Sequence, residues 1–156
     1  MKYRQLTKEQ FESLHEEFAR FLASQSIDVK EWNQIKEEKP QVAEEEMNVF
    51  SDVVWDDVLT RTAYVEHFSA NMLNLFYCDE DKMKRIVVQV NKPDIDISGQ
   101  EGYQWLLQHA TAPEVEILQG SKKYHTERNV EVFDLIEKGG TISKGELFRY
   151  FEALIS

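Results

Sequence analysis

Four side chains that can carry positive charge gather in one short stretch of an otherwise acidic chain. Lys122, Lys123, His125 and Arg128 fall within residues 120–128, which the pattern places between the end of a strand and the start of a helix. Backbone N–H groups and the helix dipole favour an anion at such a position. His125 would supply proton transfer, a common role of histidine near neutral pH. The stretch predicts a site for a phosphate or carboxylate, or alternatively a solvated loop that balances the acidic surface.

A second candidate is a tryptophan beside two acids. The helix expected over residues 40–59 carries Trp55 on its polar side, with Asp56 and Asp57 next to it. An exposed tryptophan with an acidic rim is typical of the energetically dominant centre of a protein interface. The alternative is that Trp55 packs against the sheet. The first interpretation predicts a protein partner or a homodimer.

Other chemical patterns are incomplete. Residues 94–99 fit the first six positions of an EF-hand calcium loop, but Trp105 stands where the bidentate carboxylate is needed. Cys78 and His67 could form a thiolate–imidazole pair, yet the acids at 79–81 would raise the pKa of the thiol. We therefore expect no metal, no cofactor and no catalytic residue.

The bulk composition indicates a globular protein. The 156 residues are 42% hydrophobic and 12% aromatic, and include one cysteine, which excludes an internal disulfide. A net charge of −11 repels nucleic acid and anionic lipid. No stretch approaches the roughly 20 apolar residues of a membrane span. We expect one domain, residues 1–156, in the cytoplasm, with no nucleic-acid or membrane partner.

Hydrophobic periodicity predicts an α+β fold. Three N-terminal helices are expected from about residue 7 to 24, 28 to 38 and 40 to 59, and the first opens with a capping box of Thr7 and Gln10. Strands over 64–68, 72–78 and 84–91 have short connections, which predicts an antiparallel meander. A helix capped by Ser98 and Glu101 and a strand over 115–118 would complete a βαβ unit and a mixed four-stranded sheet. Two helices, over 126–138 and from 143 onward, end the chain.

Several phrases distributed along the chain are similar to those of one protein family. They lie at residues 2–7, 14–23, 50–52, 66–68, 102–106 and 144–151. Together they resemble a small bacterial family classed only as a domain of unknown function, over nearly the whole chain. The resemblance implies a bacterial cytosolic protein with one intact domain, and it implies no activity, cofactor or binding residue.

The sequence thus favours a non-enzymatic cytosolic domain that binds another protein or itself. The alternative is an enzyme or sensor for a small anion that uses residues 122–128.

Overall fold

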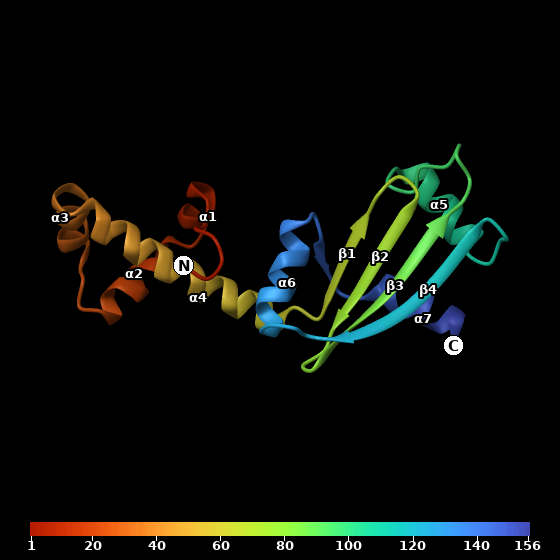
Figure 1. Cartoon of the computed structure of the whole chain (residues 1–156). Coiled ribbons are helices and arrows are strands. Elements are labelled where there is room, and N and C mark those ends of the chain that lie inside the picture. Colours follow the sequence, from red (N-terminus) through yellow and green to blue (C-terminus); the bar gives the residue numbers. More distant parts are fainter. The chain divides into compact units, whose positions relative to one another are not determined.

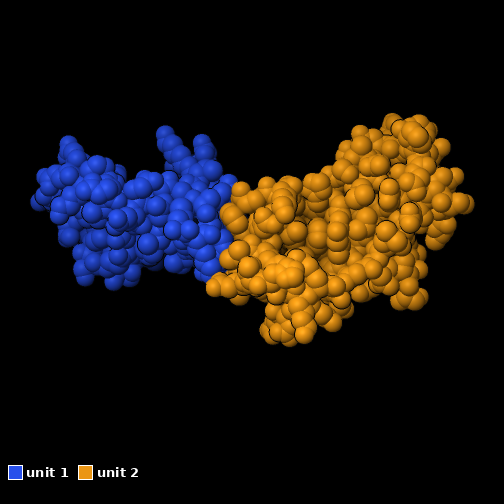
Figure 2. Space-filling model, viewed as in Figure 1, with its two compact units in different colours: residues 1–58 blue, residues 59–156 orange.

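The computed structural model describes all residues, 1–156, as seven helices and one five-stranded sheet (Figure 1). The predicted α+β class is confirmed. The chain divides into two compact units, residues 1–58 and residues 59–156 (Figure 2). None of the helices combines the length and the apolar character needed to cross a bilayer.

The first unit is helical. It contains α1 (Lys8–Ser13), α2 (His15–Ser24), α3 (Val29–Glu38) and the greater part of α4 (Pro40–Arg61). The single helix expected over residues 7–24 is broken at Leu14, where φ is −105° and ψ is 22°. The capping box is confirmed, because the Gln10 N–H donates to Thr7 Oγ1 at 3.2 Å and the Thr7 N–H donates to Gln10 Oε1 at 2.8 Å.

Aromatic rings join these helices. Phe18 of α2 lies 5.0 Å from Phe50 of α4 between ring centroids, and 5.3 Å from Trp32 of α3 in an edge-to-face contact. Phe11 of α1 and Phe21 of α2 also contact Phe50. Each such pair contributes about 0.5–1.5 kcal/mol beyond the burial of its area. One aromatic cluster therefore holds four helical segments.

The second unit is built on an antiparallel sheet with the strand order β4-β3-β2-β1-β5. The strands β1 (Tyr64–Phe68), β2 (Met72–Cys78) and β3 (Lys82–Val90) form the expected meander. β4 (Val115–Lys123) lies at one edge of the sheet (Figure 1), and β5 (Thr141–Ser143), which pairs with β1, lies at the other.

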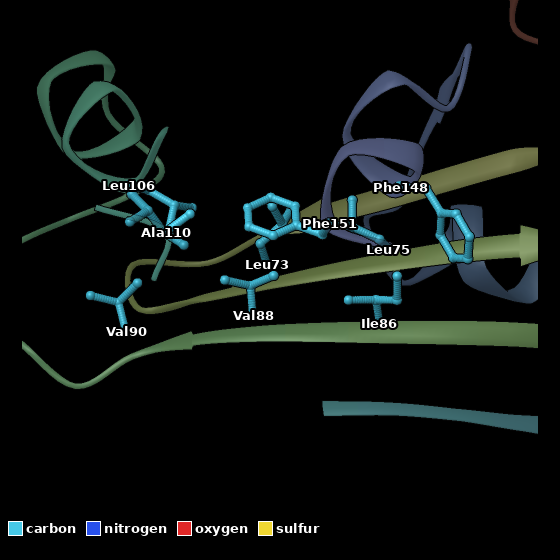
Figure 3. Packing of buried hydrophobic residues seen from close by; sticks show 10 residues of the cluster. Leu73, Leu75, Ile86, Val88, Val90, Leu106, Ala110, Phe148 and Phe151 are labelled. Carbon is cyan, nitrogen blue, oxygen red and sulfur yellow. The ribbon is translucent and has the colours of Figure 1, made fainter. Parts of the chain in front are cut away.

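The main hydrophobic core lies on one face of this sheet. Leu75 is opposite Ile86, and Leu73 is opposite Val88, so these residues of β2 and β3 share a face. Two helices, α5 (Gln100–Gln108) and α7 (Glu146–Ile155), cover it. Phe151 of α7 is fully buried there (Figure 3). The remaining members of the cluster are Val90, Ile97, Leu106, Ala110 and Phe148.

The expected parallel βαβ crossover is wrong, because β4 runs antiparallel to β3. Val90 at the end of β3 lies opposite Val115 at the start of β4, so the chain between them leaves and re-enters at the same end of the sheet. The nine residues of α5 span only about 13.5 Å. That is less than half of the roughly 30 Å needed to return along a strand of nine residues.

Two smaller features also differ from the expectation. The box of Ser98 and Glu101 does not form, since α5 begins after Gly99 and the Ser98 N–H donates to Asp96 Oδ1 at 2.9 Å. The short strand β5 was not predicted. It follows α6 (Arg128–Glu137), whose end is marked by Gly139 with φ +105°.

Candidate functional site

Strand β4 is an open edge of the sheet and pairs with β3 alone. Seven of its nine residues are exposed. Just beyond the strand, the Asn91 N–H donates to the Glu114 carbonyl at 2.7 Å, and hydrogen-bonded pairs alternate along an antiparallel ladder. Even-numbered residues of β4 therefore direct their backbone groups toward β3. The odd-numbered residues turn theirs outward and define the β4 edge: Val115, Ile117, Gln119, Ser121 and Lys123.

A groove of about 660 Å³ lies beside this edge, between α6 and the face of the sheet opposite the main core. Its apolar lining comes from Phe76, Met83, Val87 and Leu118 of the strands and Leu135 of α6. Leu118 is 52% exposed although it is a large apolar side chain. We call this hollow the α6 groove. It offers a place where an incoming apolar side chain would be covered.

Further hollows reach β4 from the other face of the sheet. One of about 540 Å³ lies between Gln119 and the end of α7, where Arg149, Glu152 and Ala153 line it. A smaller one of about 240 Å³ includes Gln119 and Gly120. A Cβ atom added at Gly120 would meet no atom within 4 Å. The middle of β4 is therefore bordered by free space on both faces.

Cationic side chains from two strands gather at one end of this edge. The register places Lys82 opposite Lys123, Lys84 opposite Ser121 and Arg85 opposite Gly120. We define the basic cluster as Lys82, Lys84, Arg85, Lys122 and Lys123. It lies in a chain whose net charge is −11. The sequence pointed to the two lysines of β4 and missed the three cations of β3, because only the antiparallel register brings them together.

Lys122 and Arg85 of the basic cluster form hydrogen bonds within the chain, and Lys84 lies over the ring of Tyr77. Lys122 Nζ lies 2.9 Å from Glu131 Oε1, and the Thr126 N–H donates to the other oxygen of Glu131 at 3.1 Å. Burial raises the pKa of the Glu131 carboxyl, but these hydrogen bonds outweigh it and the pKa is lowered overall. Arg85 Nε donates to Asn74 Oδ1 at 3.1 Å.

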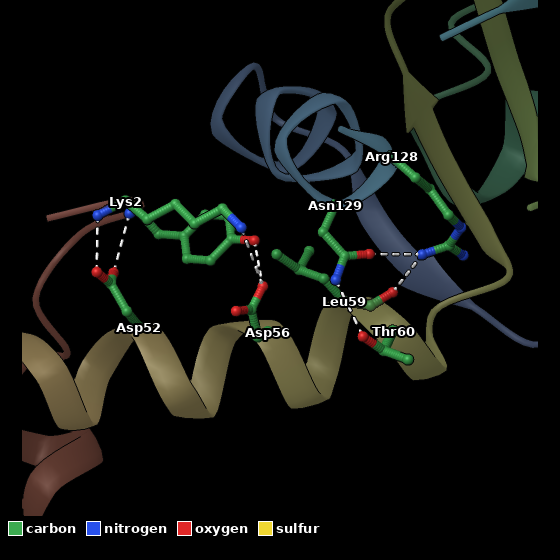
Figure 4. Close-up of polar contacts among 8 residues, drawn as sticks. Lys2, Asp52, Asp56, Leu59, Thr60, Arg128 and Asn129 are labelled. Carbon is green, nitrogen blue, oxygen red and sulfur yellow. Dashed lines mark hydrogen bonds and ion pairs between the residues drawn. The ribbon is translucent and has the colours of Figure 1, made fainter. Parts of the chain in front are cut away.

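Arg128, from the predicted anion site, contacts the backbone of several segments. Its guanidinium donates to the carbonyls of Leu59 at 2.8 Å, Cys78 at 3.0 Å and Asp79 at 3.3 Å, and also to that of Thr62. Figure 4 shows the bond to Leu59. The five N–H donors of an arginine suit this task of joining separate backbone segments. Arg128 therefore ties the end of α4 to the turn that follows β2.

The structure does not bring all four predicted anion ligands into one hollow. Lys122 lines the α6 groove, whereas Arg128 lines a separate hollow with the acids Asp79, Glu80 and Glu127. His125 is exposed, and Lys123 belongs to β4. Carboxylates beside the guanidinium disfavour a further anion there.

The tryptophan site lies in the first unit, on α4. The expectation that Trp55 is exposed is wrong, because only 9% of the residue is accessible. The Arg4 guanidinium lies 5.0 Å from the centroid of its ring, a cation–π contact. Asp56 accepts a hydrogen bond from the Tyr3 hydroxyl. The periodicity of α4 alone placed Trp55 on the polar side of the helix. It takes no account of the N-terminal segment, whose residue Arg4 lies over the tryptophan ring. A binding role for Trp55, Asp56 and Asp57 stays a prediction.

The single cysteine is not an activated nucleophile. Cys78 is 3% exposed. Burial raises the pKa of its thiol to about 11, although the nearby Arg128 guanidinium acts in the opposite direction. No three side chains among histidine, cysteine, aspartate and glutamate gather closely enough to hold a metal ion.

Comparison with known proteins gives one positive result. No curated protein and no solved structure matches this chain. A family model described as a family of unknown function (DUF6495) matches residues 1–156, the whole chain. The resemblance in the sequence phrases is thereby confirmed, and the chain belongs to the DUF6495 family.

Proposed function

We propose that this protein is a non-enzymatic interaction domain that binds an extended segment of protein along the β4 edge. The observation that carries this proposal is the row of five odd-numbered residues whose backbone groups have no strand beside them. A strand added to a sheet edge forms main-chain hydrogen bonds, which supply affinity. Native proteins usually protect an edge that is long and exposed. The nine residues of β4 are the longer of the two sheet edges.

The hollows beside β4 support the same proposal. Successive side chains of a bound strand point to opposite faces of the sheet. On one face they would meet the α6 groove, and on the other the hollow between Gln119 and α7. Main-chain bonds together with pockets for alternate side chains are the two components of recognition by strand addition.

The charges along β4 favour one orientation of the bound strand. Glu116 stands near its start, and Lys122 and Lys123 stand at its end beside the cations of β3. An antiparallel partner strand that carries acids at its start and a base near its end would be matched in charge. Complementary charge chiefly sets register and orientation.

The test is a selection of peptides of random sequence and of the same length as β4, carried out on the immobilised full chain. Binders should perturb the amide resonances of Ile117, Gln119 and Ser121. Gln119→Pro removes one outward donor without touching the ladder to β3. It should weaken binding by at least about tenfold, or about 1.4 kcal/mol.

The matched control is Gln119→Thr, which keeps the N–H and suits a strand. It should bind the selected peptides as the parent does. Peptides that perturb only distant residues, or that bind the proline variant as tightly as the parent, would contradict the proposal.

A further inference from the structure

We infer that the occupant of the β4 edge is the β4 edge of a second copy of this chain, paired antiparallel about a two-fold axis through Gln119. The inference rests on the proposed function and names its partner. The β4 strand is complementary to itself in three respects: its outward backbone groups, its charges and its side-chain volumes.

The backbone allows this register. Gln119 is the central residue of Val115–Lys123, and it is one of the residues whose backbone groups turn outward. Pairing Gln119 with its own copy places Ile117 opposite Ser121 and Val115 opposite Lys123. Every outward residue then meets another outward residue, which is the condition for hydrogen-bonded pairs. Five such pairs form about ten main-chain hydrogen bonds. Any other centre leaves part of the strand unpaired.

The charges match in the same register. Glu116 lies opposite Lys122 of the second copy, and the two-fold axis makes this pair twice. Opposite charges that face each other across two strands contribute about 0.2–1 kcal/mol, and like charges are destabilising. Lys122 already contacts Glu131, but its side chain is 52% exposed. An ammonium has three donors, so a second carboxylate can be accepted.

The side-chain volumes also match. Leu118 lies opposite Gly120 of the second copy, on the same face as the α6 groove. A Cβ atom added at Gly120 would have no neighbouring atom within 4 Å, so the space beside this glycine is open. The exposed leucine of each copy would fill the space that the glycine of the other leaves open. On the opposite face, the two Gln119 amides meet, and a primary amide is both a donor and an acceptor.

The pairing joins two five-stranded sheets into one sheet of about ten strands, which is near the upper limit for a twisted open sheet. It also covers the longer edge of each copy and leaves at the ends only β5, which has three residues. Short edge strands present little backbone for further pairing. The assembly is therefore a closed dimer and not a filament.

The first test measures mass and register together. Sedimentation equilibrium of the full chain should give a species of twice 18.4 kDa, in a fraction that rises with protein concentration. Gln119→Cys places two cysteines in facing hydrogen-bonded positions, about 5.5 Å apart between Cα atoms. That distance permits a disulfide. Mild oxidation should link the Gln119→Cys chains, while Ser121→Cys chains, which face Ile117, should stay unlinked.

The second test exchanges the charges. Glu116→Lys places a lysine opposite Lys122 of the second copy, and this like-charge pair occurs twice in the dimer, so the dissociation constant should rise by about tenfold. Lys122→Glu should do the same, and the double variant should restore the parent value to within about threefold. Glu114→Lys is the matched control, because it changes the net charge equally but faces no lysine. It should leave the dimer intact.

A chain that stays monomeric at every concentration would overturn the inference and would mean that Lys122 and Lys123 keep this edge apart. A dimer that is indifferent to the Glu116 and Lys122 exchange, or that links equally through Ser121→Cys, would overturn it as well. If selected peptides bind β4 of a monomeric chain, the proposed function stands and only the second copy is wrong. If neither peptides nor a second copy use β4, both fail.

Discussion

Lys122 of β4 and Glu131 of α6 form an ion pair at 2.9 Å that joins the edge strand to the helix beside the α6 groove. The Glu131 side chain is only 14% exposed, whereas most ion pairs of this protein lie further in solvent. The ion pair connects the two sides of the α6 groove, which are formed by β4 and α6.

Loss of the Glu131 carboxylate should destabilise the second unit. Glu131→Ala removes the acceptor for both Lys122 and the Thr126 N–H, and we expect a loss of about 1–2 kcal/mol in the free energy of unfolding. Asp134→Ala is the control on the same helix. It breaks an exposed pair with Lys138 and should cost less than about 0.5 kcal/mol. Urea unfolding of both variants measures the difference, and equal costs would contradict the structural role of Glu131.

The ionisation of Glu131 should make the free energy of unfolding depend on pH. The pKa of Glu131 is lowered in the folded chain, so its ionised form stabilises the fold above the usual pKa of 4.5. This contribution is lost as the pH falls through the lowered value. The stability difference between the parent and Glu131→Gln should therefore be constant near neutrality and shrink below about pH 4.5. A stability difference that grows on acidification would contradict a lowered pKa of Glu131 in the folded chain.

Arg128 should be a stability residue and not an anion ligand. Arg128→Ala removes the guanidinium donors to the carbonyls of Leu59, Cys78 and Asp79, and we expect a loss of about 2–4 kcal/mol. Arg128→Lys keeps the charge but has no planar fork of donors, so it should recover less than half of that loss. Thermal unfolding measures both. Full rescue by lysine would mean that charge alone matters at this position.

Gly102 in α5 should tolerate no side chain. A Cβ at this position would lie 1.8 Å from the Asp96 carbonyl oxygen and 2.3 Å from its carbon, and both are backbone atoms. We expect Gly102→Ala to cost more than about 3 kcal/mol, because the loop before α5 must shift. Gly99→Ala is the matched control, since its nearest contact is an ordinary 3.6 Å. Similar unfolding midpoints for the two variants would contradict this packing.

Cys78 should react slowly with alkylating reagents. With a pKa of about 11, only about a thousandth of the thiol is ionised at pH 8. Labelling of the folded chain should therefore be far slower than labelling of the chain in denaturant, which is the internal control. Equal rates would show that the thiol is accessible and not held in the interior.

The sequence predicted the elements whose local signals agree with their surroundings. The capping box of Thr7 and the meander through β3 are of this kind, because each depends on residues that are near one another in the chain. The full length of β4 could not be predicted from such local signals. Its last residues, Gly120 to Lys123, have weak strand propensity, yet they pair with Lys82 to Arg85 across the ladder. Pairing with β3 overrides the local preference.

The candidate site was only partly predictable for a related reason. The lysines of β4 were visible in the sequence, but the α6 groove combines β2, β3, β4 and α6, which lie up to about 60 residues apart. Whether a strand is parallel or antiparallel decides which residues face each other. The expected parallel crossover would have separated Lys82 from Lys123. The antiparallel register is what creates the basic cluster.

The strand order has a consequence for how the second unit folds. Three of the four strand pairings join strands that follow one another in the chain, and only β1 with β5 joins distant segments, residues 64–66 and 141–143. Contacts between neighbours in sequence form with little loss of chain entropy, and distant ones form slowly. We therefore expect β1 to β3 to assemble early and β5 to dock last. Its three backbone amides should then be among the first in the sheet to exchange their hydrogens with solvent.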